Sequence, residues 1–573
     1  MAHQFPQIRL GSTLFVLAVS FVLGLPMLVH GPLIDGHDTD EHLNQTKHFS
    51  EQVWEGDLYP RWLRDMNTGL GSPTYFVYPP LPAYVCVLLE PMAKVLHFNA
   101  FNIAAWLPLM CSGIAALLWL RTLFSEIVAA VSAALYLAMP YHLAIDLYRR
   151  CAIPECWAFV WMPLILYFIG GAIVGHRRDS IGLAIAFALM IFSHLISVAM
   201  FFPIPIGIAL VQSPIGQKVR SGVRIILAMA LGTGISCIYL LPALANERYI
   251  PASRIIDVHT WSYNFVGFGP SLFVYSSREN FVQTLSWMVV GMLALVLICS
   301  IAGLKWAGRK SKTVVIFSIA ICGVSTFMMS RLSSLLWRQI PGLSQAIEFP
   351  WRFNGLLCLG AVILIAVCLS STPLDWRPLR TIFSVALFVV AATWVLAYGN
   401  VWRWYKYDTP RSRDENHLVN ESDGWLPAWI PAGTSQRSSL IASFGPKVRF
   451  REGRGDARVL LWKARNIEFE TYSATGGWVM INQFYYPAWK AELVDQAKPT
   501  LIRTALPEGL LEVEAPPGTQ RIRVEIPVSF IEHLGRWISA SCVFLCMILS
   551  LDRILAQRFC SPARARRVAW PGC

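Results

Sequence analysis

The sequence predicts a polytopic α-helical membrane protein with about 12 transmembrane helices and a C-terminal, extracytoplasmic β-sandwich-like domain. Three observations predict this fold class. Of the 573 residues, 55% are hydrophobic and only 14% are charged, whereas a soluble domain carries about 25% charged residues. Apolar runs long enough to cross a bilayer recur up to residue 399 and again after residue 532. Between them lies a polar stretch with the alternating pattern of short β-strands.

The formal net charge of +13 could indicate a protein that binds nucleic acid. The lysines and arginines, however, stand in short clusters between the apolar runs. That distribution indicates membrane topology and contact with lipid headgroups. We therefore expect membrane lipids as partners, and no nucleic acid.

The first apolar run could be a cleaved secretory signal or a retained signal-anchor. No small-residue cleavage site follows it and many further spans do, so a retained signal-anchor is expected. In chain order, the predicted spans are 11–30, 101–120, 127–146, 156–175, 181–196, 197–213, 223–244, 282–304, 313–329, 353–371, 379–399 and 533–551.

A further apolar stretch, residues 81–98, contains Pro82, Glu90, Pro91 and Lys94. Such residues fit a helix lying at the membrane interface better than one crossing the hydrocarbon. If this stretch does not cross, nearly all the basic loop clusters fall on one side, which the positive-inside rule makes cytoplasmic. Both termini are then cytoplasmic. The clusters lie at 176–178, 218–224, 305–312, 377–380 and 564–567.

Under this topology, residues 31–100 form a long first outer loop and residues 400–532 form an outer cap. Short runs rich in β-branched and aromatic residues, separated by turn residues such as Gly476-Gly477, predict a small β-sandwich in the cap. The predicted strands are 459–462, 467–472, 478–482, 489–494, 501–505, 511–514 and 521–526. The chain thus divides into a membrane domain (1–399), the cap (400–532), and a last helix with a basic tail (533–573).

The 13 cysteines are scattered, without the CxxC or His/Cys spacing of a zinc site. Cys151 and Cys156 share one short loop and could form a disulfide in an oxidising compartment. Buried free thiols are common, however, and are the expectation here. No internal repeat is evident, so a transporter built from matched halves is not supported.

The start of the first outer loop holds the densest group of ionisable residues: Asp38, Asp40, Glu41 and His42. On a helix, Asp38 and His42 share a face, because they are four residues apart. Such a group suits a carboxylate base oriented by a second side chain. It also suits a divalent cation, Mg²⁺ or Mn²⁺, on Asp38, Asp40 and Glu41. A solvated acidic turn that caps a helix is the alternative. We favour a functional site, because the acids adjoin the end of a span.

Later in the same loop, Arg61 and Arg64 could bind a phosphate through their planar guanidinium groups. Tyr78 and its aromatic neighbours are typical of an interfacial belt, and equally of a platform for a lipid or a sugar. The glycines and prolines around them imply a defined backbone path.

Arg149, Arg150 and Glu155 lie where one predicted span ends and the next begins. The two arginines could simply reach the headgroups. A free carboxylate at Glu155, at the start of an apolar run, is costly, which favours a functional site facing the same cavity as the first loop.

Two further polar residues belong to later spans. His194 sits between two apolar runs, and a lone histidine there is often a satisfied core residue. Arg352 lies at the outer entry of another span, where it could grip a phosphate or serve as an interfacial anchor. Both stay candidates for substrate binding.

Together these motifs resemble the GT-C superfamily of membrane glycosyltransferases. The greatest likeness is to the bacterial branch labelled 6-pyruvoyl-tetrahydropterin synthase-related membrane proteins. The motifs are His37-Asp38 with His42, Gly56-Asp-Leu-Tyr-Pro-Arg-Trp62, Gly69-Leu-Gly-Ser-Pro73, Tyr78-Pro-Pro-Leu81, Arg150 to Glu155, Ser193-His-Leu195, Glu348-Phe-Pro-Trp-Arg352 and Tyr485-Tyr-Pro-Ala-Trp-Lys490. The pterin label itself is not expected to describe the chemistry, because those synthases are soluble zinc enzymes and no zinc-binding histidine cluster is present.

The resemblance implies a sugar transfer at the outer leaflet from a polyprenyl-phosphate donor to a lipid, glycan or protein acceptor. It implies a multi-pass protein of the bacterial inner membrane and a juxtamembrane helix in the proline-rich stretch. Asp38 would be the base that deprotonates the acceptor, supported by Asp40, Glu41 and His42, with Asp40 as the rival base. Arg150 and Arg352 would neutralise the leaving phosphate.

Two other functions stay open from the sequence. One is a flippase or transporter of lipid-linked envelope precursors, which would need ionisable residues midway along several spans. The other is a non-catalytic scaffold for envelope assembly that keeps the fold without the activity.

Overall fold

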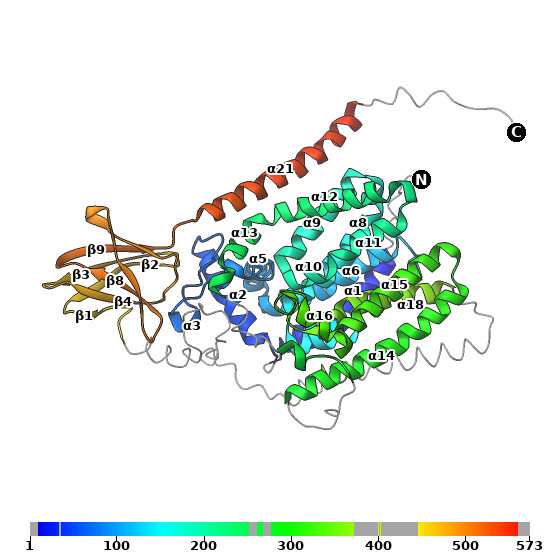
Figure 1. The fold of residues 1–573 in the computed structure, drawn as a ribbon, viewed down its shortest axis with the longest axis horizontal. Coiled ribbons are helices and arrows are strands. Elements are labelled where there is room, and N and C mark those ends of the chain that lie inside the picture. The colour runs from blue at the N-terminus through cyan, green and yellow to red at the C-terminus, as the bar shows by residue number, and fades with distance from the viewer. Residues whose placement is uncertain are drawn as a thin grey trace.

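The structure is a computed structural model that describes residues 10–33, 36–250, 260–267, 277–371, 399, 401–402 and 445–559. A helical domain forms most of the molecule, and a β-sandwich lies beyond one end of the helices (Figure 1). The last helix, α21 (Phe530–Phe559), leads from the sandwich back along the helical domain.

The long helices are α1 (Leu10–His30), α6 (Ala100–Leu120), α7 (Glu126–Leu137), α8 (Ile153–Val174), α9 (Arg177–Ser193), α12 (Lys218–Ile235), α14 (Ser277–Trp306), α15 (Arg309–Met329) and α18 (Asn354–Ser371). Medium helices are α2 (Thr39–Trp54), α5 (Leu81–Leu96), η1 (Tyr141–Arg150), α10 (Leu195–Phe201), α11 (Pro203–Gln212) and α13 (Cys237–Asn246). Short ones are α3 (Met66–Gly69), α4 (Thr74–Val77), η2 (Ile215–Gln217), η3 (Glu247–Tyr249), η5 (Thr260–Tyr263), η7 (Arg331–Ser333), α16 (Ser334–Gln339), α17 (Leu343–Ile347), η8 (Pro350–Phe353) and η11 (Val494–Gln496).

Within the described residues, nine helical segments are long and apolar enough to cross a membrane, or ten if one bent pair counts as a single span. The nine are Leu10–His30, Ala100–Leu120, Glu126–Arg150, Ile153–Val174, Leu195–Gln212, Thr284–Trp306, Ser311–Met329, Pro350–Ser371 and Phe530–Ser550. Each corresponds to a predicted span, so the polytopic fold class is confirmed. The central helix α18 is buried along nearly its whole length.

Three predicted spans differ from this set. The one at 223–244 is a pair of helices bent by 74° around Ser236, where Gly232, Gly234 and Ser236 weaken the helix. The one at 181–196 is α9, with only 17 residues. The predicted span 379–399 lies outside the described residues except at its last position.

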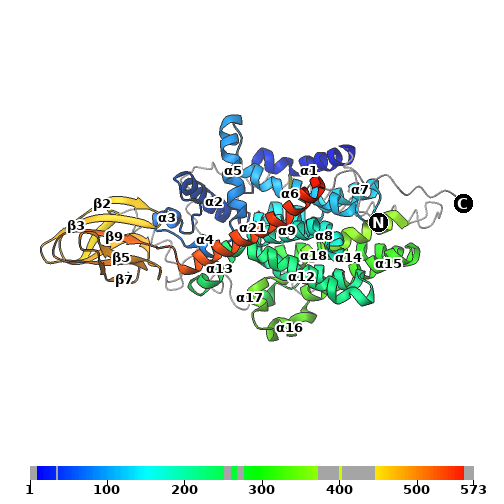
Figure 2. The same ribbon diagram turned by 90° about the horizontal axis from the view of Figure 1, so that it is seen from above.

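The interfacial stretch 81–98 forms α5, a 16-residue helix that is not among the candidate spans. Figure 2 shows that α5 runs across the direction of α21 rather than along it. The helix ends where His97 adopts a left-handed conformation, with φ of 55°. This orientation is the one expected of a helix lying at the membrane interface.

Two predicted basic clusters lie side by side. Arg224 in α12 donates a 2.8 Å hydrogen bond to the carbonyl of Ile173 at the end of α8. The turn that carries Arg177 and Arg178 therefore shares one end of the helical domain with the start of α12, in agreement with the predicted topology.

The β-sandwich has two antiparallel sheets, β1-β4-β8-β7 and β2-β3-β9-β5-β6. Their strands are β1 (Val448–Glu452), β2 (Asp456–Lys463), β3 (Asn466–Ser473), β4 (Gly477–Phe484), β5 (Lys490–Leu493), β6 (Lys498–Thr500), β7 (Ile502–Ala505), β8 (Leu510–Ala515) and β9 (Gly518–Glu525). All seven predicted strands are present. The two that were not predicted, β1 and β6, are sheet edges, where a short strand or a proline such as Pro499 weakens the sequence signal.

Candidate functional site

The first outer loop is joined to the end of η1 through the backbone of Asp38. The N–H of His37 bonds to the carbonyl of Arg149 at 3.2 Å, and the N–H of Asp38 bonds to the carbonyl of Arg150 at 2.9 Å. Asp38 is also the residue that precedes α2 at its N-terminus. These bonds fix the acid-rich start of α2 against a turn more than 100 residues further along the chain.

Arg150 forms the centre of a buried ionic cluster. Its Nη2 lies 3.3 Å from Asp38 Oδ2, and its Nη1 lies 2.7 Å from both Asp146 Oδ1 and Glu155 Oε2. The side chain of Asp38 is 38% exposed, whereas those of Arg150 and Asp146 are 6% and 0% exposed. Only Asp38 therefore presents a carboxylate of this cluster to a substrate.

A tight turn brings Arg150 and Glu155 together. Cys151 adopts a left-handed conformation with φ of 58°, and the N–H of Ala152 bonds to the carbonyl of Asp146 at 2.8 Å. Pro154 then begins α8, at a position where its missing N–H costs no hydrogen bond. Cys151 and Cys156 are both buried, and no disulfide joins them.

Arg352 extends the ionic cluster from the start of the span that includes α18. Its Nη1 donates to Glu348 at 2.6 Å and to the carbonyl of Ile347 at 3.1 Å, and its Nε lies 3.7 Å from Glu155 Oε2. The ring of Trp351 contacts both arginines, with Arg150 4.9 Å and Arg352 5.9 Å from the ring centre. The guanidinium groups predicted from the sequence therefore meet in one place.

A small cavity lies beside Arg352. Ser197, which hydrogen-bonds to Nδ1 of His194 at 2.8 Å, is one of its lining residues. The others are Glu155, Phe159, Met162, Met200, Arg352, Gly355 and Leu356. One wall is thus charged and the rest is largely apolar.

The other residues at the start of α2 take different positions. Asp40 is exposed, and Glu41 accepts a hydrogen bond from the side-chain amide of Gln45. His42 is buried, its N–H bonds to the carbonyl of Asp38 at 3.1 Å, and burial lowers its pKa to about 4. Among the described residues, no group of three or more His, Cys, Asp or Glu side chains is arranged to hold a metal ion, including the predicted set of acids in α2.

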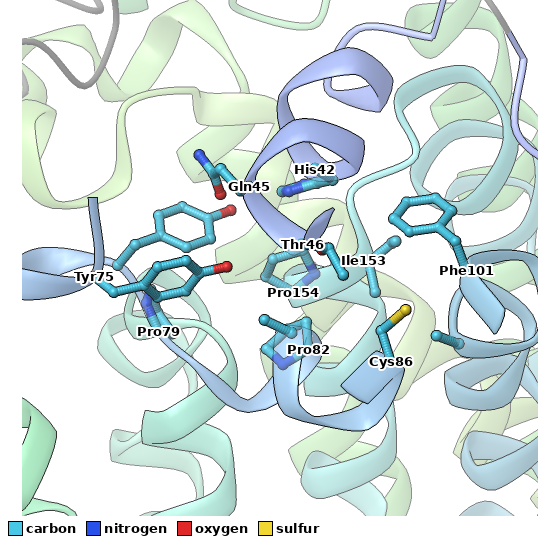
Figure 3. A pocket seen from close by; sticks show the side chains of 13 residues that line it. His42, Gln45, Thr46, Tyr75, Pro79, Pro82, Cys86, Phe101, Ile153 and Pro154 are labelled. Carbon is cyan, nitrogen blue, oxygen red and sulfur yellow. The ribbon is translucent and has the colours of Figure 1, made fainter. Parts of the chain in front are cut away.

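A second cavity is lined by residues of α2, the start of α5 and the start of α8 (Figure 3), and Tyr78 is one of its lining residues. The ring of Tyr78 lies 6.1 Å from that of His42. Burial raises the pKa of Tyr78 well above its usual value, so the phenol stays protonated. The predicted platform residue is therefore next to the acids of α2.

Arg61 was predicted to bind phosphate with the other arginines, but it lies in a different buried network. Its Nη2 donates to the carbonyl of Ile238 at 2.7 Å, and its Nε lies 3.2 Å from Glu532 in α21. Glu532 also pairs with Arg465 of the β-sandwich at 3.0 Å. The guanidinium of Arg61 thus ties the first loop to the last helix and to the sandwich.

Arg64, in the same loop, is bound by two carboxylates and by a carbonyl of the β-sandwich. It pairs with Glu55 at 2.8 Å and with Asp65 at 2.7 Å, and it donates to the carbonyl of Trp462 at 3.3 Å. The hydrogen bonds that Arg64 donates to Glu55 raise the pKa of Arg64 above its usual value. Both arginines are thus engaged by carboxylates and carbonyls of the protein itself, away from the ionic cluster around Arg150, although Nη1 of Arg61 has no hydrogen-bond partner among the described residues. Phosphate binding by Arg61 and Arg64 stays a prediction.

Sequence reasoning named Asp38, Arg149, Arg150, Glu155, His194 and Arg352, all of which lie at or next to the ionic cluster. It did not name Gln45 or Tyr141, although the hydroxyl of Tyr141 donates to Glu155 at 2.8 Å. Tyr75 was named only as one of the aromatic neighbours of Tyr78, as part of an interfacial belt or of a platform for a lipid or a sugar. Helical spacing could have found Gln45, which lies three residues after His42 on the same face of α2.

Comparison with known proteins adds the following. No curated protein sequence matches the chain. It is similar to the solved structure of the mycobacterial arabinofuranosyltransferase AftD, with 13% identity and a TM-score of 0.44 over 71% of this chain and 27% of AftD. It is similar as well to the structure of ArnT from Cupriavidus metallidurans bound to undecaprenyl phosphate, with 15% identity and a TM-score of 0.42 over 76% of this chain and 69% of ArnT. A third similar structure is the Archaeoglobus fulgidus oligosaccharyltransferase, with 12% identity and a TM-score of 0.43 over 76% of this chain and 60% of that protein. The chain spans about a quarter of the length of AftD. At these identities and scores the likeness says nothing about the reaction.

A family match covers residues 75–401, which is more than half of the chain. The matching description is "6-pyruvoyl-tetrahydropterin synthase related domain; membrane protein", the branch expected from the sequence motifs. The expectation is confirmed, and the chain belongs to the 6-pyruvoyl-tetrahydropterin synthase-related family of membrane proteins.

Proposed function

We propose that this protein is a membrane glycosyltransferase that moves a sugar from a polyprenyl-phosphate donor to an acceptor at the outer face of the membrane. The observation that supports it most is the pairing of a half-exposed Asp38 with the buried Arg150. A base must keep its carboxylate accessible to the acceptor while its position is fixed. Asp38 meets both conditions, because Arg150 holds its backbone and its side chain.

The two central arginines support different tasks. Both terminal nitrogens of Arg150 donate hydrogen bonds to carboxylates of the protein, those of Asp38, Asp146 and Glu155. Its guanidinium is suited to positioning Asp38. Arg352 makes no hydrogen bond through Nε, and it lines a largely apolar cavity. It is the better candidate to neutralise the phosphate as negative charge develops.

In the proposed reaction, Asp38 takes the proton of the acceptor hydroxyl as that oxygen forms a bond to the anomeric carbon. The bond between this carbon and the phosphate oxygen breaks, and the lipid phosphate leaves with the electron pair. Base and leaving group then stand on opposite faces of the sugar, as in inverting hydrolases.

The test is turnover of polyprenyl-phosphate sugars by the purified full-length protein. Asp38→Asn is expected to lower the rate by roughly 100-fold or more, with an unchanged melting temperature. Asp495→Asn, an exposed acid of the β-sandwich, is the matched control and should retain full activity. If Asp38→Asn stays active and Asp40→Asn does not, Asp40 is the base. Movement of the lipid without a new glycosidic bond would identify a flippase instead.

A further inference from the structure

A narrow pocket with a mixed polar and apolar lining lies one helical turn from Asp38. It is bounded by α2, the start of α5, α6 and the start of α8 (Figure 3). Its lining residues are His42, Gln45, Thr46, Tyr75, Tyr78, Pro79, Pro82, Ala83, Cys86, Phe101, Ala104, Ile153 and Pro154. The cavity has a volume of about 10 Å³, which is roughly the space that one water-sized group needs.

Gln45 presents an unpartnered hydrogen-bond acceptor to this pocket. The residue is only 1% exposed, and its amide nitrogen donates to Glu41. That bond fixes the orientation of the amide and leaves Oε1 buried without a hydrogen-bond partner. A buried carbonyl oxygen without a hydrogen-bond partner is unfavourable, so a donor entering the pocket is favoured.

Tyr75 presents an unpartnered hydroxyl to the same pocket. The side chain is 2% exposed, and its ring packs against Phe49 at 4.5 Å and Tyr78 at 6.1 Å. No hydrogen bond to the Tyr75 hydroxyl is formed by the residues that the structure describes. Figure 3 shows Gln45 and His42 on α2, with Tyr75 entering the same pocket from α4. The pocket therefore offers an acceptor and a hydroxyl from two different elements, the helix α2 and the short helix α4.

The lining carries no Asp, Glu, Lys or Arg side chain. Prolines 79, 82 and 154 give the pocket a rigid wall, and Phe101 and Ile153 close its apolar side. A carboxylate in this space would have no cation to pair with and could not donate to Gln45. An ammonium group would have no carboxylate among the lining residues. An uncharged hydroxyl satisfies both groups, because it donates to Gln45 and accepts from Tyr75.

We propose that Gln45 and Tyr75 form a recognition site for one hydroxyl group of an uncharged sugar ring seated next to Asp38. The use of this site in a reaction rests on the proposed function, since the ring can be that of the donor or of the acceptor. His42 links the two places: its backbone N–H bonds to the carbonyl of Asp38, and its side chain lines the pocket.

The test measures binding without turnover, so that it does not depend on the proposed reaction. Asp38→Asn protein in detergent is titrated with methyl glycosides of neutral hexoses and pentoses, and binding is followed by saturation-transfer NMR. At least one neutral glycoside is expected to bind. Tyr75→Phe and Gln45→Met should each weaken that binding about tenfold, as expected for one buried hydrogen bond. Tyr84→Phe is the matched control: its ring also packs on Phe49, but its hydroxyl bonds to Leu58 outside the pocket.

Single-deoxy glycosides identify the hydroxyl. One deoxy sugar should bind the unsubstituted pocket roughly 100-fold more weakly than its parent, because it loses both hydrogen bonds. In Tyr75→Phe this difference should shrink to about tenfold, because only the hydrogen bond to Gln45 is left to lose. Three results would overturn the proposal: equal binding by all variants, no glycoside binding, or a preference for glucuronides or amino sugars. Equal binding by all variants would mean that the pocket holds only water. Donor and acceptor are separated by kinetics: Tyr75→Phe raises the KM of one substrate and leaves that of the other unchanged. If the pocket binds glycosides while no donor is turned over, the proposed function fails and the site stands.

Discussion

Trp62 of the first outer loop donates its indole N–H to the side-chain carbonyl of Gln483 in β4 at 2.7 Å, and both side chains are completely buried. The amide nitrogen of Gln483 donates in turn to the carbonyls of Arg64 and Gly69, at 3.1 Å and 2.8 Å. The Gly69-Leu-Gly-Ser-Pro73 motif is thus the surface on which the β-sandwich docks. Because the same loop carries Asp38 and Tyr75, the sandwich holds the candidate site in place from outside the membrane.

Replacing Gln483 by Leu should loosen this docking. The indole N–H of Trp62 and two backbone carbonyls would stay buried without their partner, at about 1–3 kcal/mol for each unsatisfied group. We expect a lower melting temperature of the purified protein and faster protease cleavage between the membrane domain and the sandwich. Gln496→Leu, an exposed amide in the same domain, should behave like the unsubstituted protein. Identical melting of the two variants would contradict the docking role of Gln483.

Gly71→Ala tests the same contact through the backbone. Gly71 has φ of +84°, and a Cβ there would lie 2.5 Å from Gln483 Oε1 and 2.7 Å from the Trp62 ring. The strain of a left-handed alanine costs about 1 kcal/mol, and the clash adds to it. Gly56→Ala is a matched control, because Gly56 has φ of +101° with nothing within 4 Å of the added carbon. The difference between the two melting temperatures measures the clash alone, and no difference would show that the docking surface tolerates a side chain.

The sequence predicted the sandwich strands and most spans, because alternation and hydropathy are local properties. It also predicted that Asp38, Arg150, Glu155 and Arg352 would meet, because topology places the ends of their spans at one face. It could not predict the partners of Arg61. Glu532, which neutralises it, lies at the other end of the chain, and nothing local distinguishes an arginine that binds phosphate from one that binds a distant carboxylate.

The bend at Ser236 and the pocket beside Gln45 could not be predicted from the sequence, for a related reason. Glycines allow a helix to bend without requiring it, and the 74° angle depends on how α13 packs on α21. The role proposed for Gln45 rests on the missing hydrogen-bond partner of its Oε1. That absence is a property of the packed structure and has no sequence pattern.

Arg150→Gln should destabilise the protein by about 3–5 kcal/mol, because Asp146 and Glu155 would lose the cation that compensates them in a buried position. Turnover should also be lost, because the side chain of Asp38 would lose its ion pair with Arg150. The double variant Arg150→Gln/Asp146→Asn should recover part of the stability, since one buried carboxylate is then neutral, but no activity. Chemical denaturation in detergent measures both effects. If the double variant is no more stable than the single one, the unpaired carboxylate of Asp146 is not the cause of the destabilisation.

His42 should make stability depend on pH. Burial lowers its pKa in the folded protein to about 4, against 6.5 in the unfolded chain; nearby Asp38 opposes this shift and Arg150 adds to it. Between these values the unfolded chain binds more protons, so stability is complete above pH 6.5, falls as the pH drops toward 4, and levels off below. The loss is about 3 kcal/mol. Melting curves across this range should be flatter for His42→Gln, whereas His48→Gln, a less buried histidine of α2 that pairs with Glu51, should keep the slope of the unsubstituted protein. If His42→Gln loses stability just as steeply on acidification, the acid sensitivity belongs to other groups and His42 is not the buried neutral residue that orders the start of α2.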